Sequence, residues 1–423
     1  MPALRRLRAA AVDIGPLRRS PAFRRLWAGQ LVSMLGRQVT TVALPYQVFA
    51  LTHSTLAVGT LGLVQLVPLL CASLFGGAIA DRANRRTVLL ITNVGLASGS
   101  TVLALAALSG SPPVALLFVV AGVVGAVGAV DQPARSATIP NLVSAADLPG
   151  AMALNFGLFS AALVIGPALG GVLIGALGLP AAYFVDVATF GAAIAAVVSL
   201  PSQPPRHAAA ESPLRAIATG LRYVGARRDI LGSFAIDIVA MVFGMPRALY
   251  PVLAAGTYHT GPQGLGLLYA APGAGALLAI VAGGGAGRVR HLGRLVVFSV
   301  IAWGLAIAVA GAVPVLWVAL LGLAVAGAAD CISAIGRSTM MQASTPDHLR
   351  GRLSATFTMV VAGGPYLGDI EAGGVAAATS PRVSFVSGGL LCLVGVAAVC
   401  AAFPQLWRYR REPAAEPDAL TGR

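Results

Sequence analysis

The sequence predicts an all-α polytopic membrane protein with twelve transmembrane helices in two pseudo-symmetric six-helix bundles. Charged residues are only 10% of the 423 residues, against about 25% in ordinary soluble proteins, and the mean hydropathy is +0.83. The apolar residues gather in runs of about 20 or more that polar breaks separate, as bilayer-spanning helices require. Features of the first half also recur in the second half.

Twelve apolar runs are long enough to cross a bilayer. The expected spans cover residues 25–51, 57–80, 87–108, 114–134, 151–177, 181–200, 229–254, 264–286, 295–311, 314–336, 353–378 and 383–404. We therefore expect a basic N-terminus (1–24), a first bundle (25–200), a linker (201–228), a second bundle (229–404) and a tail (405–423). Within the linker, apolar residues at helical spacing predict an amphipathic helix at the membrane surface, and these are Leu214, Ile217, Leu221 and Val224.

The basic residues, all 29 of them arginine, fall in alternate breaks between the spans. Arginines precede the first span and fill the second break and the linker, whereas the breaks near 52–56, 109–113, 178–180 and 312–314 have none. Because positively charged loops stay on the cytoplasmic side, we expect a multi-pass protein of the plasma membrane with both termini in the cytoplasm. This placement explains the basic character without a nucleic-acid partner.

The two halves of the chain look like the products of a duplication. Residues 24–29 (RRLWAG) match 227–232 (RRDILG), and the segment that begins at Arg135 matches the one that begins at Arg337, at an offset near 202 residues. Duplicated bundles are typical of secondary transporters, whose substrate site lies between the halves near the middle of the membrane.

The break after the second span, residues 77–86 (GAIADRANRR), concentrates charge in an apolar chain. Gly77 lies one turn before Asp81 and allows a neighbouring helix to approach closely. A carboxylate at a helix end favours the positive N-terminus of another helix. Arg82, Arg85 and Arg86 are either part of such a contact or only anchors that hold the loop in the cytoplasm.

This stretch resembles the loop between the second and third helices of the major facilitator superfamily. It departs from the family pattern at Asn84, where glycine is usual, and we expect asparagine to take the same left-handed turn. The resemblance implies that Asp81 contacts the start of the eleventh helix, near Leu353–Ala355, and that the two halves part when this latch opens.

Two charged residues at the end of the fourth span belong either to the same latch or to a local pair. Asp131 and Arg135 are one helical turn apart, which by itself predicts an i,i+4 ion pair, while the resemblance suggests that they join the Asp81 network. Asp330 and Arg337 are their looser counterparts in the second half.

The fifth span contains GPALGG, with Gly166, Pro167, Gly170 and Gly171. It resembles the Gly-Pro signature of antiporters in the superfamily, although close helix packing explains these residues equally well. Residues 23–54, 131–143 and 344–357 look like the drug:proton antiporter branch, which contains the enterobactin exporter and macrolide-efflux proteins. This resemblance covers nearly the whole chain and favours export.

Charges inside the spans are candidates for coupling because an unpaired charge in hydrocarbon is costly. Arg37 lies about 18 Å into the first span at helical rise, too deep for an unpaired guanidinium. Its candidate partners are Asp237, Asp186, and Asp369 or Glu371. We expect Arg37, Asp237, Asp369 and Glu371 to couple protons or substrate, with structural pairing as the alternative, and we expect Asp186 to be structural.

The sequence favours a transporter over an enzyme. Neither a Walker loop nor a GxSxG nucleophile occurs, and the histidines and four cysteines have no metal-ligand spacing. We expect no cofactor and no metal, and a monomer whose ligands are a small molecule and protons. The predicted function is proton-coupled efflux of small amphipathic molecules, such as drugs or siderophores, by alternating access; the alternatives are uptake, or a non-transporting membrane scaffold or sensor.

Overall fold

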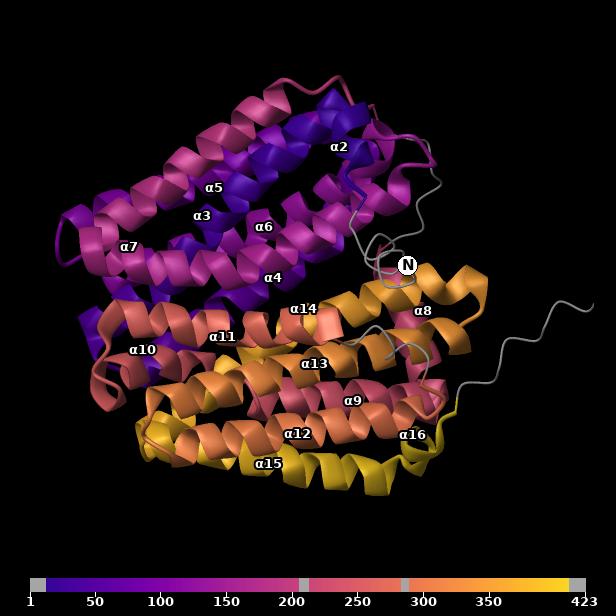
Figure 1. Cartoon of the computed structure of the whole chain (residues 1–423). Helices are drawn as coiled ribbons and strands as arrows, with labels where there is room; N and C mark the ends of the chain where they lie inside the picture. Colours follow the sequence, from indigo (N-terminus) through magenta and orange to yellow (C-terminus); the bar gives the residue numbers. More distant parts are fainter. Residues whose placement is uncertain (1–12, 205–212, 283–288, 411–423) are drawn as a thin grey trace, which may run out of the picture.

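The computed structural model describes residues 13–204, 213–282 and 289–410. Within these ranges the side chains are described except at 74–82, 213–217, 347–348, 350–352, 354–356 and 358. The described chain is helical nearly throughout (Figure 1).

The first half contains five long helices and one short one: α2 (Gly15–Arg19), α3 (Pro21–Thr52), α4 (Thr55–Arg82), α5 (Arg85–Leu108), α6 (Val114–Leu142) and α7 (Leu148–Val198). The second half contains α8 (Pro213–Ala226), α9 (Arg228–Phe243), η1 (Arg247–Leu249), α10 (Tyr250–Val252), η2 (Leu253–Thr257), α11 (Gly261–Ala282), α12 (Leu292–Ala312), α13 (Leu316–Ser344), α14 (Asp347–Ala378), α15 (Pro381–Ala402) and α16 (Pro404–Arg408).

Nine helical stretches in the described part of the chain are long and apolar enough to cross a membrane. One of them, α7, holds two of the predicted spans, because Gly178 takes a left-handed backbone (φ 83°) at which the chain turns back. The remaining predicted spans correspond to α3 and α14, which are 32 residues long and carry more charge. The prediction of an all-α membrane protein is confirmed.

Two predicted helices were too short, and a third predicted helix is broken. The helices α6 and α13 continue to Leu142 and Ser344, beyond the apolar part from which their ends were predicted. The seventh span stops at Phe243 and resumes as short helical turns after Pro246. Proline has no N–H to donate and disfavours a helical residue before it. The indole N–H of Trp303 donates to the carbonyl of Gly244 at 2.8 Å and so satisfies a group that the break leaves free.

The helices form two bundles, one from each half of the chain (Figure 1). In the first, α7 packs along α3 and α5, and α6 packs along α4 and α5. In the second, α12 packs along α13 and α15, and α13 along α11. One end of the molecule carries α2, α8 and α16 (Figure 1), and we call it the arginine-rich end after Arg18, Arg19, Arg222, Arg227, Arg228 and Arg408. The opposite end, with α10 and the Gly178 turn, is the far end.

The two bundles touch backbone to backbone near the far end. The helix α7 packs along α11, and α4 packs along α14. A Cβ built on Gly171 lies 2.9 Å from the Cα of Gly266, and one built on Gly373 lies 3.0 Å from the Cα of Gly59. Small residues are what allow helices to approach this closely, so these four glycines define the closed far end.

An ion pair fixes the arginine-rich end of the first bundle. The guanidinium of Arg19 on α2 lies 2.5 Å from the carboxylate of Asp147, which precedes α7. The hydroxyl of Ser144 also donates to Asp147 at 2.9 Å. These hydrogen bonds, from Arg19 above all, hold the pKa of Asp147 below its usual value.

We predict that Gly171→Val opens the far end. The added side chain meets the backbone of α11 at a closed contact, and overpacking costs about 1–3 kcal/mol, which changes the balance between closed and open states roughly 5- to 150-fold. In a cysteine-free background, labelling of Thr41→Cys by an impermeant maleimide added at the far end should rise by this factor. The control is Gly157→Val on the same helix, where an added Cβ meets nothing within 4 Å; equal labelling of both variants would contradict the contact.

Candidate functional site

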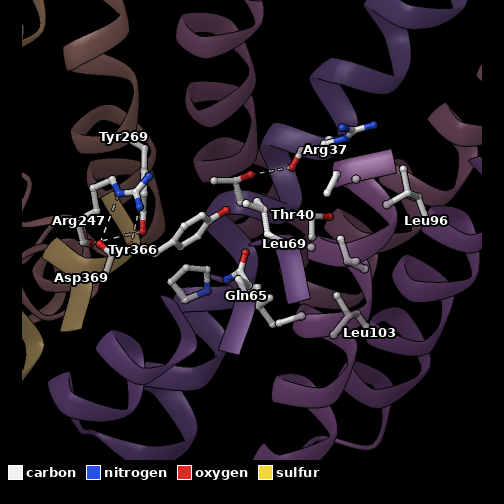
Figure 2. A pocket seen from close by; sticks show the side chains of 18 of the residues that line it. Arg37, Thr40, Gln65, Leu69, Leu96, Leu103, Arg247, Tyr269, Tyr366 and Asp369 are labelled. Atoms are coloured by element: carbon white, nitrogen blue, oxygen red, sulfur yellow. Dashed lines mark hydrogen bonds and ion pairs between the residues drawn. The ribbon is translucent and has the colours of Figure 1, made fainter. Parts of the chain in front are cut away.

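A cavity of about 310 Å³ lies between the two bundles. Its wall combines residues of α3, α4 and α6 in the first half with residues of η1, α11 and α14 in the second. Figure 2 shows Arg247 and Asp369 on one side of this cavity and Arg37, with Thr40 and Leu96, on the other. Both halves of the chain therefore contribute charged groups to one space.

The second-half wall is built around an ion pair. A terminal nitrogen of the Arg247 guanidinium donates to Oδ2 of Asp369 at 2.7 Å. The guanidinium also lies over the ring of Tyr366, 5.6 Å from its centroid. Arg247 can reach this position because the seventh span is broken at Pro246 and the chain turns into the cavity before α10.

Two further cavities of about 420 Å³ each adjoin the first. One shares Arg247, Tyr269 and Tyr366 with it and extends among α7, α11, α12 and α13. The other shares Arg37 and Gln132 with it and extends along α3, α6 and α7 towards the arginine-rich end. These adjoining cavities thus run from that end into the middle of the molecule.

The first half holds a buried cluster of three charged residues on α3 and α6, which we call the N-half cluster: Arg37, Asp131 and Arg135. Arg135 lies 3.0 Å from Asp131, which is 1% exposed. Arg37 lies 3.7 Å from the same carboxylate. The hydroxyl of Thr92 on α5 donates to Asp131 at 2.8 Å. The local i,i+4 pair predicted from the sequence is present, and it joins a third helix through Arg37.

The second half holds the corresponding C-half cluster: Asp237 on α9, and Asp330 and Arg337 on α13. Arg337 forms a direct ion pair with Asp237 and lies 3.7 Å from Asp330. Its guanidinium also lies 5.7 Å from the centroid of the Phe357 ring on α14. Arg135 and Arg337, which the duplication aligns, therefore hold equivalent places. The N-half cluster has two arginines and one aspartate, whereas the C-half cluster has two aspartates and one arginine.

Arg37 forms no ion pair with any of the partners predicted for it from the sequence, which include Asp186. Asp237 pairs with Arg337, and Asp369 pairs with Arg247. The ion-pair partner of Arg37 is Asp131, and its guanidinium lies 5.9 Å from the centroid of the Phe190 ring. Glu371 is half-buried on α14, away from these clusters, and pairs with no arginine among the described residues.

The described residues that follow the second span, from 83 onwards, contact other parts of the first half of the chain. Asn84 caps α5 by accepting from the N–H of Arg86 at 3.1 Å, and Arg86 donates to the carbonyl of Val198 at 2.6 Å. The expected left-handed turn is wrong, because the capping position requires an extended backbone (φ −63°, ψ 114°). The structure does not describe the side chains of Asp81, Arg82 and Ala355, or the surroundings of Gly77. Ala355 belongs to the part of α14 where the contact with Asp81 was expected. The latch therefore stays a prediction.

The glycines of the fifth span make close contacts in two directions. A Cβ built on Gly170 lies 3.1 Å from the Cα of Val39 on α3, and one on Gly166 meets Gln38 of the same helix. Gly171 instead faces α11 of the other bundle. Pro167 also contacts α11: a Cβ built on Gly266 lies 2.6 Å from the carbonyl oxygen of Pro167. These contacts show close packing, and a role of this motif in antiport stays a prediction.

Comparison with known proteins supports one family. Residues 11–415 match the profile of the transmembrane secretion effector family. The chain is 29% identical over 403 residues to the enterobactin exporter of Citrobacter koseri, which covers 95% of this chain and 96% of that protein. It is 27% identical over the same length to the enterobactin exporter of Escherichia coli O81.

Solved transporter structures share the fold at low sequence identity. A point mutant of the nucleoside transporter NupG superposes with a TM-score of 0.74 at 13% identity, covering 90% of this chain and all of that chain. A bacterial homologue of the human lysosomal transporter Spinster superposes with a TM-score of 0.71 at 17% identity, covering 93% and 98%. The chain therefore belongs to the transmembrane secretion effector family of the major facilitator superfamily, whose members are membrane transporters of small molecules and not enzymes.

Proposed function

We propose that this protein is a proton-coupled exporter that takes small amphipathic molecules from the cytoplasm and releases them on the other side of the plasma membrane. The observation that carries the proposal is the path of cavities, which begins near the arginine-rich end, together with the close glycine contacts that join the two bundles near the far end. If the arginine-rich end faces the cytoplasm, as the positive-inside rule predicts, this is the loading state of an exporter.

The lining of the path fits an amphipathic substrate. Met152, Phe156 and Phe159 line the cavity nearest the arginine-rich end and are between 42% and 57% exposed. Further in, the aromatic rings of Tyr269 and Tyr366 lie beside the Arg247 guanidinium. Large apolar surfaces next to a few fixed polar groups are typical of small-molecule sites. The relatives named as enterobactin exporters support export of a small molecule such as a siderophore.

Proton coupling has a structural candidate in the Arg247–Asp369 pair. Of the residues predicted for coupling, Arg37 and Asp369 line the central cavity. A carboxylate that faces a wet cavity beside a cation can exchange its proton as the surroundings alternate. Asp237 is 1% exposed and enclosed with Arg337, which suits a structural pair better than direct exchange.

We predict that purified protein in liposomes moves substrate against an imposed pH gradient. The probes are enterobactin, ethidium and erythromycin, each tested with the gradient in either direction and with the gradient collapsed by a protonophore. Export coupled to protons requires that accumulation reverses with the gradient and disappears on its collapse. Movement indifferent to the gradient would exclude proton coupling, accumulation driven together with protons would indicate uptake, and no movement of any probe would favour a scaffold or sensor.

We predict that Asp369→Asn removes gradient-driven accumulation while probe exchange at equal pH persists. The single variant leaves Arg247 without its partner. Breaking a fully buried pair costs about 3–5 kcal/mol, and we expect a smaller loss here because the pair is only partly buried. The matched variant Arg247→Gln/Asp369→Asn removes both charges and should recover most of the thermal stability lost by the single variant.

Dye accumulation and melting temperature together separate the two roles of the pair. A coupling role requires that the double variant is stable but still uncoupled. If the double variant accumulates dye as wild type does, Asp369 is a structural residue.

A further inference from the structure

Asp186 on α7 is a buried carboxyl group that the ion pairs described above do not use. It is 1% exposed and lies where α7 packs along α3 and α5. Oδ2 accepts from the hydroxyl of Thr40 on α3 at 2.6 Å and from that of Ser100 on α5 at 2.7 Å. Within the described residues no arginine lies at ion-pair distance from it.

The hydrogen bonds of the other oxygen, Oδ1, indicate where a proton sits. Oδ1 lies 3.4 Å from the hydroxyl of Thr189, but that hydroxyl donates to the backbone carbonyl of Asp186 at 2.6 Å. A hydroxyl has one proton to give, and the shorter contact takes it, so Thr189 is a weak donor to Oδ1. An ionised Oδ1 would be buried with this long contact as its one donor among the described residues, which is unfavourable, whereas a protonated Oδ1 can donate to Thr189.

The carboxyl group of Asp186 packs against a glycine of α3, Gly36. A Cβ built on Gly36 of α3 lies 2.7 Å from Oδ1 and also meets the Thr189 hydroxyl. Glycine at position 36 therefore lets the carboxyl lie against the backbone of α3.

The guanidinium of Arg37 lies near Asp186 but forms no ion pair with it. Arg37 is next to Gly36 and one turn from Thr40, and its guanidinium lies over Phe190, which is one turn from Asp186 on α7. The ion pair of Arg37 to Asp131 is long, at 3.7 Å, and Asp131 already has Arg135 as a closer partner. Nε of Arg37 makes no hydrogen bond to the described residues. Arg37 is the charged group that faces Asp186 from α3; α5 presents Ser100, and α7 itself presents the Tyr183 phenol, which donates to Gln47.

We propose that Asp186 is a proton-binding site, held as a neutral carboxylic acid in this conformation, and that Arg37 is the cation that releases the proton. When the bundles rock, Arg37 leaves Asp131 to Arg135 and pairs with Asp186, whose O–H bond breaks as the proton passes to the water-filled cavity. The role in transport rests on the proposed proton coupling, but the protonation state itself does not depend on it.

Infrared difference spectroscopy of the purified full chain in lipid tests the protonation state without any substrate. At neutral pH, subtracting the spectrum of Asp186→Asn from that of wild type should leave the C=O band of a protonated carboxyl group. The matched control Asp369→Asn removes an arginine-paired acid and should retain that band. Loss of an ionised carboxylate band in Asp186→Asn, with the protonated band unchanged, would overturn the proposal.

Two milder variants test the surroundings and keep the proposal falsifiable if Asp186→Asn folds poorly. Ser100→Ala removes a donor that favours the ionised form, and Arg37→Gln removes the cation that favours it. Each should raise the pH at which the protonated band disappears by about one unit. An unchanged midpoint in Arg37→Gln would overturn the role of Arg37, and an unchanged midpoint in both would overturn the site. Failure of the transport assay with a band that behaves as expected would refute only the coupling.

Discussion

The cost of a charge in hydrocarbon organises this protein more than any other constraint. A charged side chain inside a span is tolerated when it is paired, hydrogen-bonded or in contact with water. The N-half cluster ties α3 to α6, the C-half cluster ties α9 to α13, and Arg247 ties the end of the seventh span to α14. Elsewhere the helices are apolar on most sides, so lipid and neighbouring helices compete equally for their faces. The ion pairs therefore select which helices are neighbours.

The glycine contacts have a complementary effect between the bundles. Ion pairs within a bundle are strong and directional, whereas Gly59 with Gly373 and Gly171 with Gly266 meet through backbone atoms. Such contacts depend on shape and need no polar partner to be released. The surfaces between the bundles can thus separate while each bundle keeps its helix packing, and the proposed change of partner by Arg37 is a side-chain movement within the first bundle.

The sequence predicted the fold class well because bilayer thickness and backbone hydrogen bonding leave few alternatives. It also predicted the Asp131–Arg135 pair, which lies within one helix. It failed for pairs between helices, such as Arg37 with Asp131, since helices that are apolar all round give no signal for their rotation. Arg247 was not among the predicted site residues, although it lies inside the predicted span 229–254. The signal that could have revealed it is Pro246, which breaks that span and turns the arginine inward.

The Arg19–Asp147 pair outside the membrane has a consequence for how the molecule senses its surroundings. Since Arg19 keeps the pKa of Asp147 below its usual value, this carboxylate stays ionised through mild acidification, and the contact between α2 and α7 persists. This contact is therefore insensitive to mild acidification. Buried acids within the bundles, such as Asp186, differ from Asp147 because burial and hydroxyl partners replace solvent around them.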